Sequence, residues 1–317
     1  MKLIVSELGA LKGYVSREFY FIMTELIEAY GWKHVETLRL LHAHGSLKER
    51  ILKETSEMPE VILFWESYSL LNPHARDVHD LDCLKCFFAD DLHWWSEAKR
   101  FANYVSYLLC DMLLSPYAYR LDKFYPGLAG LKKIFWVPHS ASPDFRIDYN
   151  ERPENAILLS GAIADCYPLR EKMLRLYEQR SYPIIFQRHP GYHCQHDYDT
   201  SESIGRNYAK KINRHRAAFT DCAKFNYVVA KYFEIPSIGT LLLADGAVRG
   251  PLRELGFIPD EHYTSATEED MEEKIRYILD ERNHSRTDEI RRRAQELVRE
   301  KHKTSDRATL IDEMCRQ

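Results

Sequence analysis

Short, mostly apolar runs alternate with stretches of helical spacing along the whole chain. The runs predict buried strands at residues 3–5, 61–64, 84–88, 134–137, 156–159, 184–186, 217–220 and 240–244. Between them, apolar residues three and four apart predict helices after a candidate N-cap at Ser16 and over 95–109, 271–280 and 286–303. Apolar runs separated by helices are typical of parallel strands that are covered on both faces.

A segment rich in turn formers divides this pattern into two similar halves. It places a domain boundary between about residues 140 and 152. We predict an α/β protein with domains at 1–145 and 146–302, and a last helix over 303–317 that packs back on the first domain. Ligands of open α/β sheets sit at the carboxyl ends of the strands, so the residues that follow each strand are the candidates for chemistry.

Composition and charge narrow the class of protein. The 317 residues are 45% hydrophobic and 29% charged, which is typical of a globular chain. The net charge of −4 argues against a nucleic-acid-binding protein, which would carry a basic excess. No apolar run reaches the roughly 18–20 residues of a membrane helix. Seven cysteines, an odd number, are scattered along the chain, so we expect a reduced, cytoplasmic protein.

The most informative segment is 231–245. It places Glu234 at the start of a short helix, and Gly239 ends that helix before an apolar strand. A carboxylate there can accept hydrogen bonds from both hydroxyls of a ribose, while the helix N-terminus offers N–H groups to phosphate. Alternatively, Glu234 only caps its helix, and the spacing does not decide between the two.

At these residues the sequence resembles the C-terminal domain of GT-B glycosyltransferases, most closely the family 1/4 group with its CgeB-like branch. In that group a Glu, followed after four residues by a Gly and then a strand, ends the Glu-x7-Glu motif that holds the nucleotide sugar. Glu234 matches the second Glu, whereas Asn226 stands eight residues earlier in place of the first. The resemblance loosely covers residues 155–302.

The resemblance implies a GT-B fold, in which two Rossmann-like domains with parallel sheets face a central cleft. It implies a hexosyl- or pentosyltransferase that moves a sugar from a nucleoside-diphosphate sugar to an acceptor hydroxyl, with retention of configuration. No metal, other cofactor or protein nucleophile is then expected. The acceptor, whether glycan, lipid or protein, stays open.

Several cationic and flexible residues follow the strands of the second half. Gly161 allows close backbone approach to a phosphate, and a basic pair, Arg188 and His189, comes directly after a strand. The resemblance implies that Gly161 and Arg170 face the diphosphate and that Arg188 and Lys231 act where other enzymes use a metal. Ordinary turns and solvated loops are the alternatives. The predicted donor-binding residues are Gly161, Arg170, His189, Lys224, Asn226, Tyr227 and Glu234, and the predicted catalytic residues here are Arg188 and Lys231.

In the first half, two carboxylates, an imidazole and two indoles follow the strand at 84–88. Aromatic faces stack on sugars, and a carboxylate or imidazole can orient an acceptor hydroxyl. The family often has a His-Asp pair here, so Asp91 and His93 are the predicted catalytic residues on the acceptor side. Alternatively, the indoles at 94 and 95 are core and an aspartate caps the helix. The loop at 6–13 and the pair His139 and Ser140 are further candidates.

Other patterns carry less functional weight. A zinc site at Cys83 and Cys86 lacks a second cysteine pair, and we interpret the histidine-rich stretch at 189–196 as a polar loop. The pair at 90–91 leaves open a metal-dependent GT-A transferase. Because Asn226 replaces an acid, a non-catalytic nucleotide-sugar or glycan-binding protein is the main alternative. The arginine run at 291–293 is predicted to be a solvated helix face paired with nearby glutamates.

Overall fold

The computed structural model describes residues 1–94, 96–193 and 195–316, and their contacts divide the chain into two compact units. The first unit holds residues 1–12 and 19–138 and the C-terminal residues from Arg307. The second unit holds residues 13–18 and 139–306. The main division thus follows Pro138, at the start of the turn-rich segment, and a short piece near the N-terminus belongs with the second unit.

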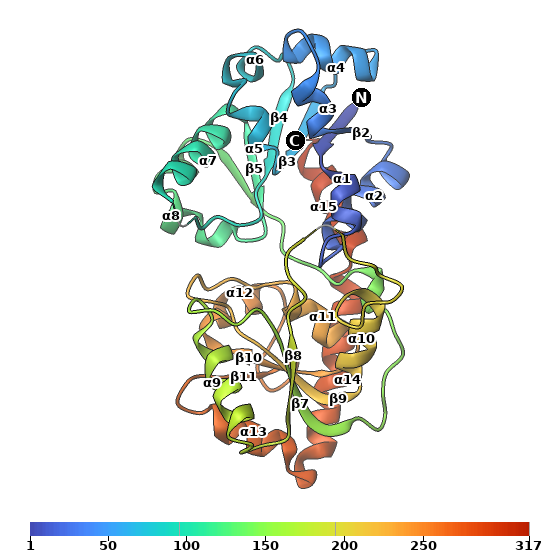
Figure 1. Ribbon diagram of the computed structural model, residues 1–317, viewed down its shortest axis with the longest axis vertical. Coiled ribbons are helices and arrows are strands. Elements are labelled where there is room, and N and C mark those ends of the chain that lie inside the picture. Colours follow the sequence, from blue (N-terminus) through green and yellow to red (C-terminus); the bar gives the residue numbers. More distant parts are fainter. Residues whose placement is uncertain (95, 194, 317) are drawn as a thin grey trace. The chain divides into compact units, whose positions relative to one another are not determined.

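Six parallel strands form the sheet of the first unit, in the order β2-β1-β3-β4-β5-β6 (Figure 1). They are β1 (Lys2–Ser6), β2 (Lys33–Glu36), β3 (Val61–Trp65), β4 (Leu84–Phe88), β5 (Met112–Ser115) and β6 (Lys133–Trp136). The central strand β3 is buried along its whole length, as the continuous apolar run predicts.

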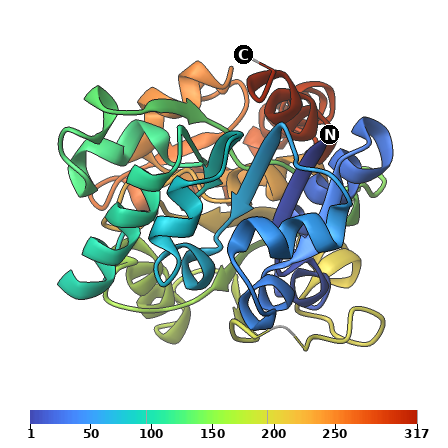
Figure 2. The same cartoon turned by 90° about the horizontal axis from the view of Figure 1, so that it is seen from above.

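Helices cover both faces of this sheet. They are α1 (Leu8–Lys12), α2 (Glu18–Tyr30), α3 (Thr37–His42), α4 (Leu47–Thr55), α5 (Tyr68–Leu71), α6 (Ala75–His79), α7 (Glu97–Leu109), α8 (Leu121–Phe124) and, from its fourth residue onward, α15 (Thr304–Met314). Ala308 and Ile311 of α15 pack into the same core as Ile4 of β1. Figure 2 shows this last helix, in dark red, beside the first strand, in dark blue, where Lys2 Nζ lies 2.5 Å from Asp312 Oδ1.

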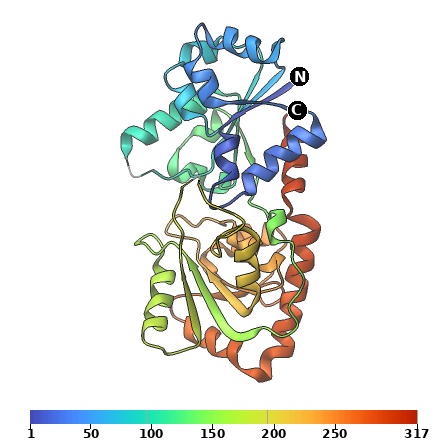
Figure 3. The same cartoon turned by 45° about the vertical axis from the view of Figure 1, so that its right-hand side comes forward.

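The second unit has a five-stranded parallel sheet in the order β11-β10-β9-β7-β8. Its strands are β7 (Glu154–Gly161), β8 (Ile184–Arg188), β9 (His215–Thr220), β10 (Leu241–Asp245) and β11 (Thr264–Ala266). Its helices are α9 (Pro168–Glu178), α10 (Gly205–Asn213), α11 (Lys231–Ser237), α12 (Arg249–Glu254), α13 (Met271–Leu279) and α14 (His284–Lys301). Figure 3 shows α9 on one side of this sheet and α10 and α14 on the other.

The predicted strands are all present, within a few residues of their expected ends, but three further strands were not predicted. They are β2, β5 and β11. Helix α2 begins at Glu18, two residues after the expected cap, and α7 begins at Glu97. No helix of the described residues is long and apolar enough to cross a membrane.

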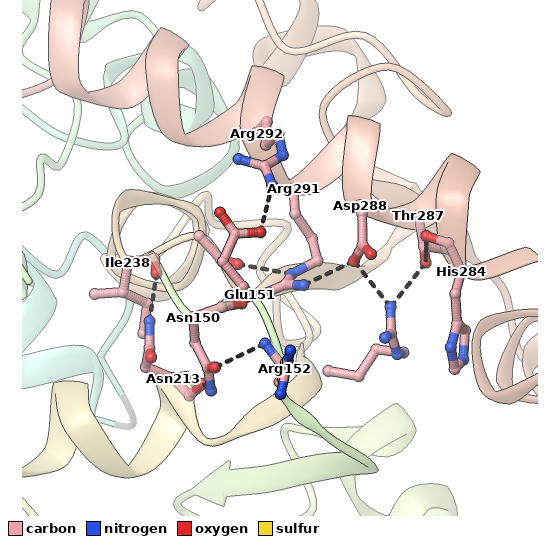
Figure 4. Close-up of polar contacts among 12 residues, drawn as sticks. Asn150, Glu151, Arg152, Asn213, Ile238, His284, Thr287, Asp288, Arg291 and Arg292 are labelled. Carbon is pink, nitrogen blue, oxygen red and sulfur yellow. Dashed lines mark hydrogen bonds and ion pairs between the residues drawn. The ribbon is translucent and has the colours of Figure 1, made fainter. Parts of the chain in front are cut away.

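The prediction that residues 291–293 form a solvated helix face is wrong for Arg291, whose side chain is fully buried. Its Nε donates to the carbonyl of Gly239 (2.8 Å), and one terminal nitrogen donates to the carbonyl of Asn150 (2.8 Å). The other terminal nitrogen donates to Asp288 (2.7 Å), as Figure 4 shows. Arg291 is buried because all three nitrogens of its guanidinium find oxygen partners. Arg292, in contrast, is exposed and pairs with Glu151.

Candidate functional site

The candidate residues of the second unit come together at the carboxyl edge of its sheet. Strand β7 ends at Gly161, which is paired in register with Arg188 at the end of β8. Strand β9 ends next to them at Thr220, and Asp221 follows directly. Parallel strands of an open sheet present their ligand-binding loops at this edge. The side chains described next all surround it.

Glu234 is the most unusual of these residues. It lies in the first turn of α11, and it is only 8% exposed. Its carboxylate accepts no hydrogen bond from any residue that the structure describes. Burial raises the pKa of Glu234 to about 7, against the opposing effect of the Lys231 ammonium. Because this carboxylate bonds none of the described backbone N–H groups at the start of α11, Glu234 does not cap its helix, and its oxygens are available to a ligand.

Lys231, one turn earlier on α11, is held by two hydroxyls. Its Nζ donates to the Tyr208 hydroxyl (2.5 Å) and to Ser160 Oγ (3.3 Å). These two hydroxyl oxygens are themselves 2.5 Å apart. The three side chains come from α11, α10 and β7, so the position of the ammonium is fixed by three elements.

Gly161 and Arg170, which the resemblance placed at the diphosphate, lie close to each other in the structure. Gly161 has a φ of +112°, and a Cβ there would meet Arg170 at 3.0 Å and Lys231 at 3.4 Å. Arg170 is 3% exposed, and its Nε lies 3.0 Å from Asp221 Oδ1. Burial raises the pKa of Asp221 to about 6, although the Arg170 guanidinium opposes this rise. Much of the charge of Arg170 is therefore already balanced by Asp221.

The loop after β8 carries the other predicted cationic pair. Arg188 is exposed and makes no side-chain hydrogen bond or ion pair with the described residues. His189 accepts a hydrogen bond from the backbone N–H of Gly191 (3.0 Å). Burial, together with the Lys231 and Arg170 cations, lowers the pKa of His189 to about 4. His189 is thus neutral at physiological pH, which leaves Arg188 as the charged member of the pair.

The residues after β9 form a tight turn that leads to α11. Asn226 has a left-handed backbone (φ +58°), and the Cys222 thiol lies 3.8 Å from its side-chain oxygen. Tyr227 is 2% exposed and belongs to the core, while Lys224 is exposed. The left-handed backbone of Asn226 is a conformation that few side chains other than Asn or Asp adopt.

Sequence reasoning missed the contribution of residues 13–18 to the second unit. Arg17 forms a two-pronged ion pair with Asp144 (2.6 and 3.0 Å). Glu18, which is 3% exposed, accepts hydrogen bonds from the backbone and side chain of Ser140 and lies 2.8 Å from His139 Nδ1. His139 and Ser140, which were further candidates, are thus buried against this glutamate. Partners more than 120 residues apart leave no local signal in the sequence.

The acceptor-side candidates lie in the first unit, in the loop after β4. His93 Nδ1 is 3.6 Å from Asp91 Oδ1, and burial lowers the pKa of His93 while the Asp91 carboxylate opposes this. Glu66, which was not predicted, joins them, because its carboxylate accepts from the backbone N–H of Asp90 (3.3 Å). Its φ of +50° is strained for a glutamate, as is common at functional sites. Trp94 lies edge-on to Tyr68, and residue 95 is outside the described residues.

The described cysteines and candidate metal ligands form neither disulfides nor a metal-binding group. Within residues 1–94, 96–193 and 195–316, no three His, Cys, Asp or Glu side chains are grouped as a metal site requires. Of the cysteines, the six that are described are all free thiols, and Cys194 lies outside the described residues.

Comparisons with known proteins bear on part of the second unit and on the fold. Residues 184–313 match the family model described as glycosyl transferase-like, and this range contains both Lys231 and Glu234. This match confirms the predicted enzyme class, a glycosyltransferase, while the CgeB-like branch stays a prediction. The comparison with curated protein sequences gave no significant match.

Solved structures resemble the whole chain at low sequence identity. An α-glucosyltransferase in complex with UDP and DNA has a TM-score of 0.63 at 10% identity, covering 100% of this chain and 99% of that one. HepE of Anabaena in complex with UDP-glucose has a TM-score of 0.61 at 10% identity, covering 99% of both chains. A glycosyltransferase of Rickettsia africae has a TM-score of 0.57 at 10% identity, covering 99% and 97%. The predicted GT-B fold is confirmed, which sets aside the GT-A alternative.

Proposed function

We propose that this chain, which carries a glycosyl transferase-like domain on a GT-B fold, transfers a sugar from a nucleoside-diphosphate sugar to an acceptor hydroxyl, with retention of configuration and without a metal. The observation that carries the proposal is the Glu234 carboxylate, which is largely buried in the first turn of α11 and accepts no hydrogen bond from the part of the chain that the structure describes. The two hydroxyls of a ribose would supply the missing donors.

Two cations at the carboxyl edge of the sheet would bind the diphosphate in this proposal. Lys231 presents its ammonium at the end of β7, and Arg188 is exposed at the end of β8. In the proposal both stabilise the charge that develops on the leaving diphosphate as the bond between it and the sugar breaks. Arg170 and Gly161 shape the same corner, and His189, Lys224 and Asn226 complete the donor-binding set, while the buried Tyr227 belongs to the core of the same turn.

The first unit supplies the acceptor side in this proposal. Asp91 and His93 orient the acceptor hydroxyl, whose oxygen bonds to the anomeric carbon on the face that the diphosphate leaves. The hydroxyl proton passes to an oxygen of the departing phosphate, so no protein nucleophile is needed. The order of bond changes predicts a product with the same anomeric configuration as the donor.

Donor binding is the first test, and UDP-glucose is the first donor to try, because it is bound in the HepE structure. Thermal-shift screening should include UDP-, GDP-, ADP- and TDP-sugars, since a ligand of the native state raises its melting temperature. Glu234→Ala and Arg188→Ala should each weaken donor binding about tenfold or more, whereas the exposed Glu254→Ala should not. Unchanged donor affinity in both site variants would remove this assignment.

The chemistry needs separate measurements. NMR of the product reports whether the anomeric configuration is retained, and transfer should continue in EDTA. A non-catalytic nucleotide-sugar-binding protein is the second candidate, because Asn226 stands where the resemblance expects an acid. That candidate would be favoured if calorimetry detects donor binding while neither transfer to any member of an acceptor panel nor hydrolysis of the donor is observed.

A further inference from the structure

Hydrogen bonds to two hydroxyls leave one N–H group of the Lys231 ammonium for a ligand. A lysine ammonium has three N–H groups, and two of them are directed to the hydroxyls of Tyr208 and Ser160. Tyr208 is 7% exposed and Ser160 is 4% exposed, so both acceptors are largely shielded from solvent. Because lysine is a flexible side chain, these two contacts determine where the third N–H points.

Gly161 forms the wall beside this ammonium. A Cβ at this position would lie 3.4 Å from Lys231 Cε and 3.0 Å from the Arg170 guanidinium, so the glycine lets both side chains approach the same stretch of backbone. The two side chains therefore line one corner beside the end of β7, where Lys231 supplies most of the positive charge because Asp221 balances much of that of Arg170. An anion with two phosphates matches such a corner better than an anion with one, because its charge is larger and spans more than one oxygen group.

We propose that Tyr208 and Ser160 are positioning residues that hold Lys231 so that the site distinguishes a nucleoside diphosphate from a nucleoside monophosphate. This inference rests on the proposed function. Neither hydroxyl contacts the reacting atoms in this proposal. Both act through the Lys231 ammonium, so removing either hydroxyl keeps the positive charge but leaves its position less well defined.

The test compares UDP and UMP as probes in isothermal titration calorimetry. Tyr208→Phe removes the hydroxyl but keeps the ring, which packs edge-on against Phe145 and lies 4.7 Å from Lys231 Nζ. Ser160→Ala removes the second acceptor. The matched control is Tyr182→Phe, whose hydroxyl bonds Glu272 and Arg276 in the same unit.

We expect both site variants to bind UDP about tenfold more weakly than the wild type while their affinity for UMP changes less than about twofold. The control should keep the wild-type affinities for both probes. Lys231→Met should lose more of the preference for UDP than either site variant, because the ammonium itself is gone and only Arg188 remains.

The possible failures are distinguishable. If Tyr208→Phe and Ser160→Ala keep the wild-type ratio of UDP to UMP affinity, or lose affinity for both probes equally, the positioning role is wrong. If Lys231→Met keeps that ratio, Lys231 does not contact the second phosphate and the inference is again overturned. If the wild type binds neither UDP nor any other nucleoside diphosphate, the proposed function fails and the inference fails with it.

Discussion

Glu234 gives the second unit a pH-dependent stability that one amide substitution should remove. Burial raises the pKa of its carboxyl from 4.5 to about 7, so the folded state holds the proton more tightly than the unfolded chain. The resulting stabilisation is complete below about pH 4.5 and is lost as the pH rises through 7. From these two pKa values, Glu234 lowers the free energy of unfolding, relative to its value in acid, by about 1 kcal/mol at pH 5 and by about 3 kcal/mol at pH 8.

Glu234→Gln keeps the shape of the side chain and removes its charge. We expect the free energy of unfolding of this variant, relative to the wild type, to rise by about 2 kcal/mol between pH 5 and pH 8. All five tryptophans lie between Trp32 and Trp136, outside the second unit, so tryptophan fluorescence does not follow its unfolding. Urea unfolding should be followed by far-ultraviolet circular dichroism and by hydrogen exchange of the amides in α11.

The exposed Glu254→Gln is the matched control, because it makes the same exchange without burial. If the difference between Glu234→Gln and the wild type stays within about 0.5 kcal/mol over this pH range, the carboxyl is not desolvated and our reasoning about the site is wrong. Bound UDP should shrink the difference above pH 7, because ribose hydroxyls that donate to the carboxylate stabilise its charged form.

Three further predictions test other parts of the second unit. Arg291→Met should lower the free energy of unfolding by about 3 kcal/mol in the same urea assay. Arg292→Met removes only an exposed ion pair and should leave the free energy of unfolding nearly unchanged, so equal effects of the two substitutions would contradict the buried network. Gly161→Ala should cost about 1–3 kcal/mol and weaken UDP binding, because its φ is +112° and its Cβ would press on Arg170, whereas Gly250→Ala has open space around it and should do neither. The pKa of His189 is lowered from 6.5 to about 4, so its contribution to stability is present above pH 6.5 and is lost as the pH falls through 4. The melting temperature of His189→Gln should therefore fall less than that of the wild type between pH 6.5 and pH 4. An equal fall in both proteins would refute the lowered pKa.

The buried parallel strands could be predicted because a continuous apolar run bounded by turn residues has few other uses in a globular chain. The strands that were missed differ in that respect. β2 and β11 lie at the edges of their sheets and contain polar residues, so they lack such a run. β5 is apolar, but it follows α7 after only two residues, so its run merges with the apolar end of that helix.

For the candidate site, the resemblance to a known family named both Lys231 and Glu234, which lie three residues apart in α11. It did not predict the hydroxyls of Tyr208 and Ser160, which come to Lys231 from two other elements and follow no local pattern. Asp221 could have been proposed, since a carboxylate that directly follows a buried strand is a usual ligand position. Its pairing with Arg170 depends on which strands are neighbours, and that order is a property of the whole sheet.

Arg291 marks the boundary between what spacing can and cannot decide. The burial of this position could have been predicted, because residues 290, 294, 297 and 298 form the buried stripe of α14 and residue 291 lies on the same face. Composition favoured the opposite interpretation, since arginine is rarely fully buried. The conflict is resolved by oxygens from elsewhere in the chain: the carbonyls of Gly239 and Asn150 reach the guanidinium from segments 52 and 141 residues away. A charged residue on an apolar stripe therefore predicts a buried network only once its partners are known, and the partners are supplied by the fold.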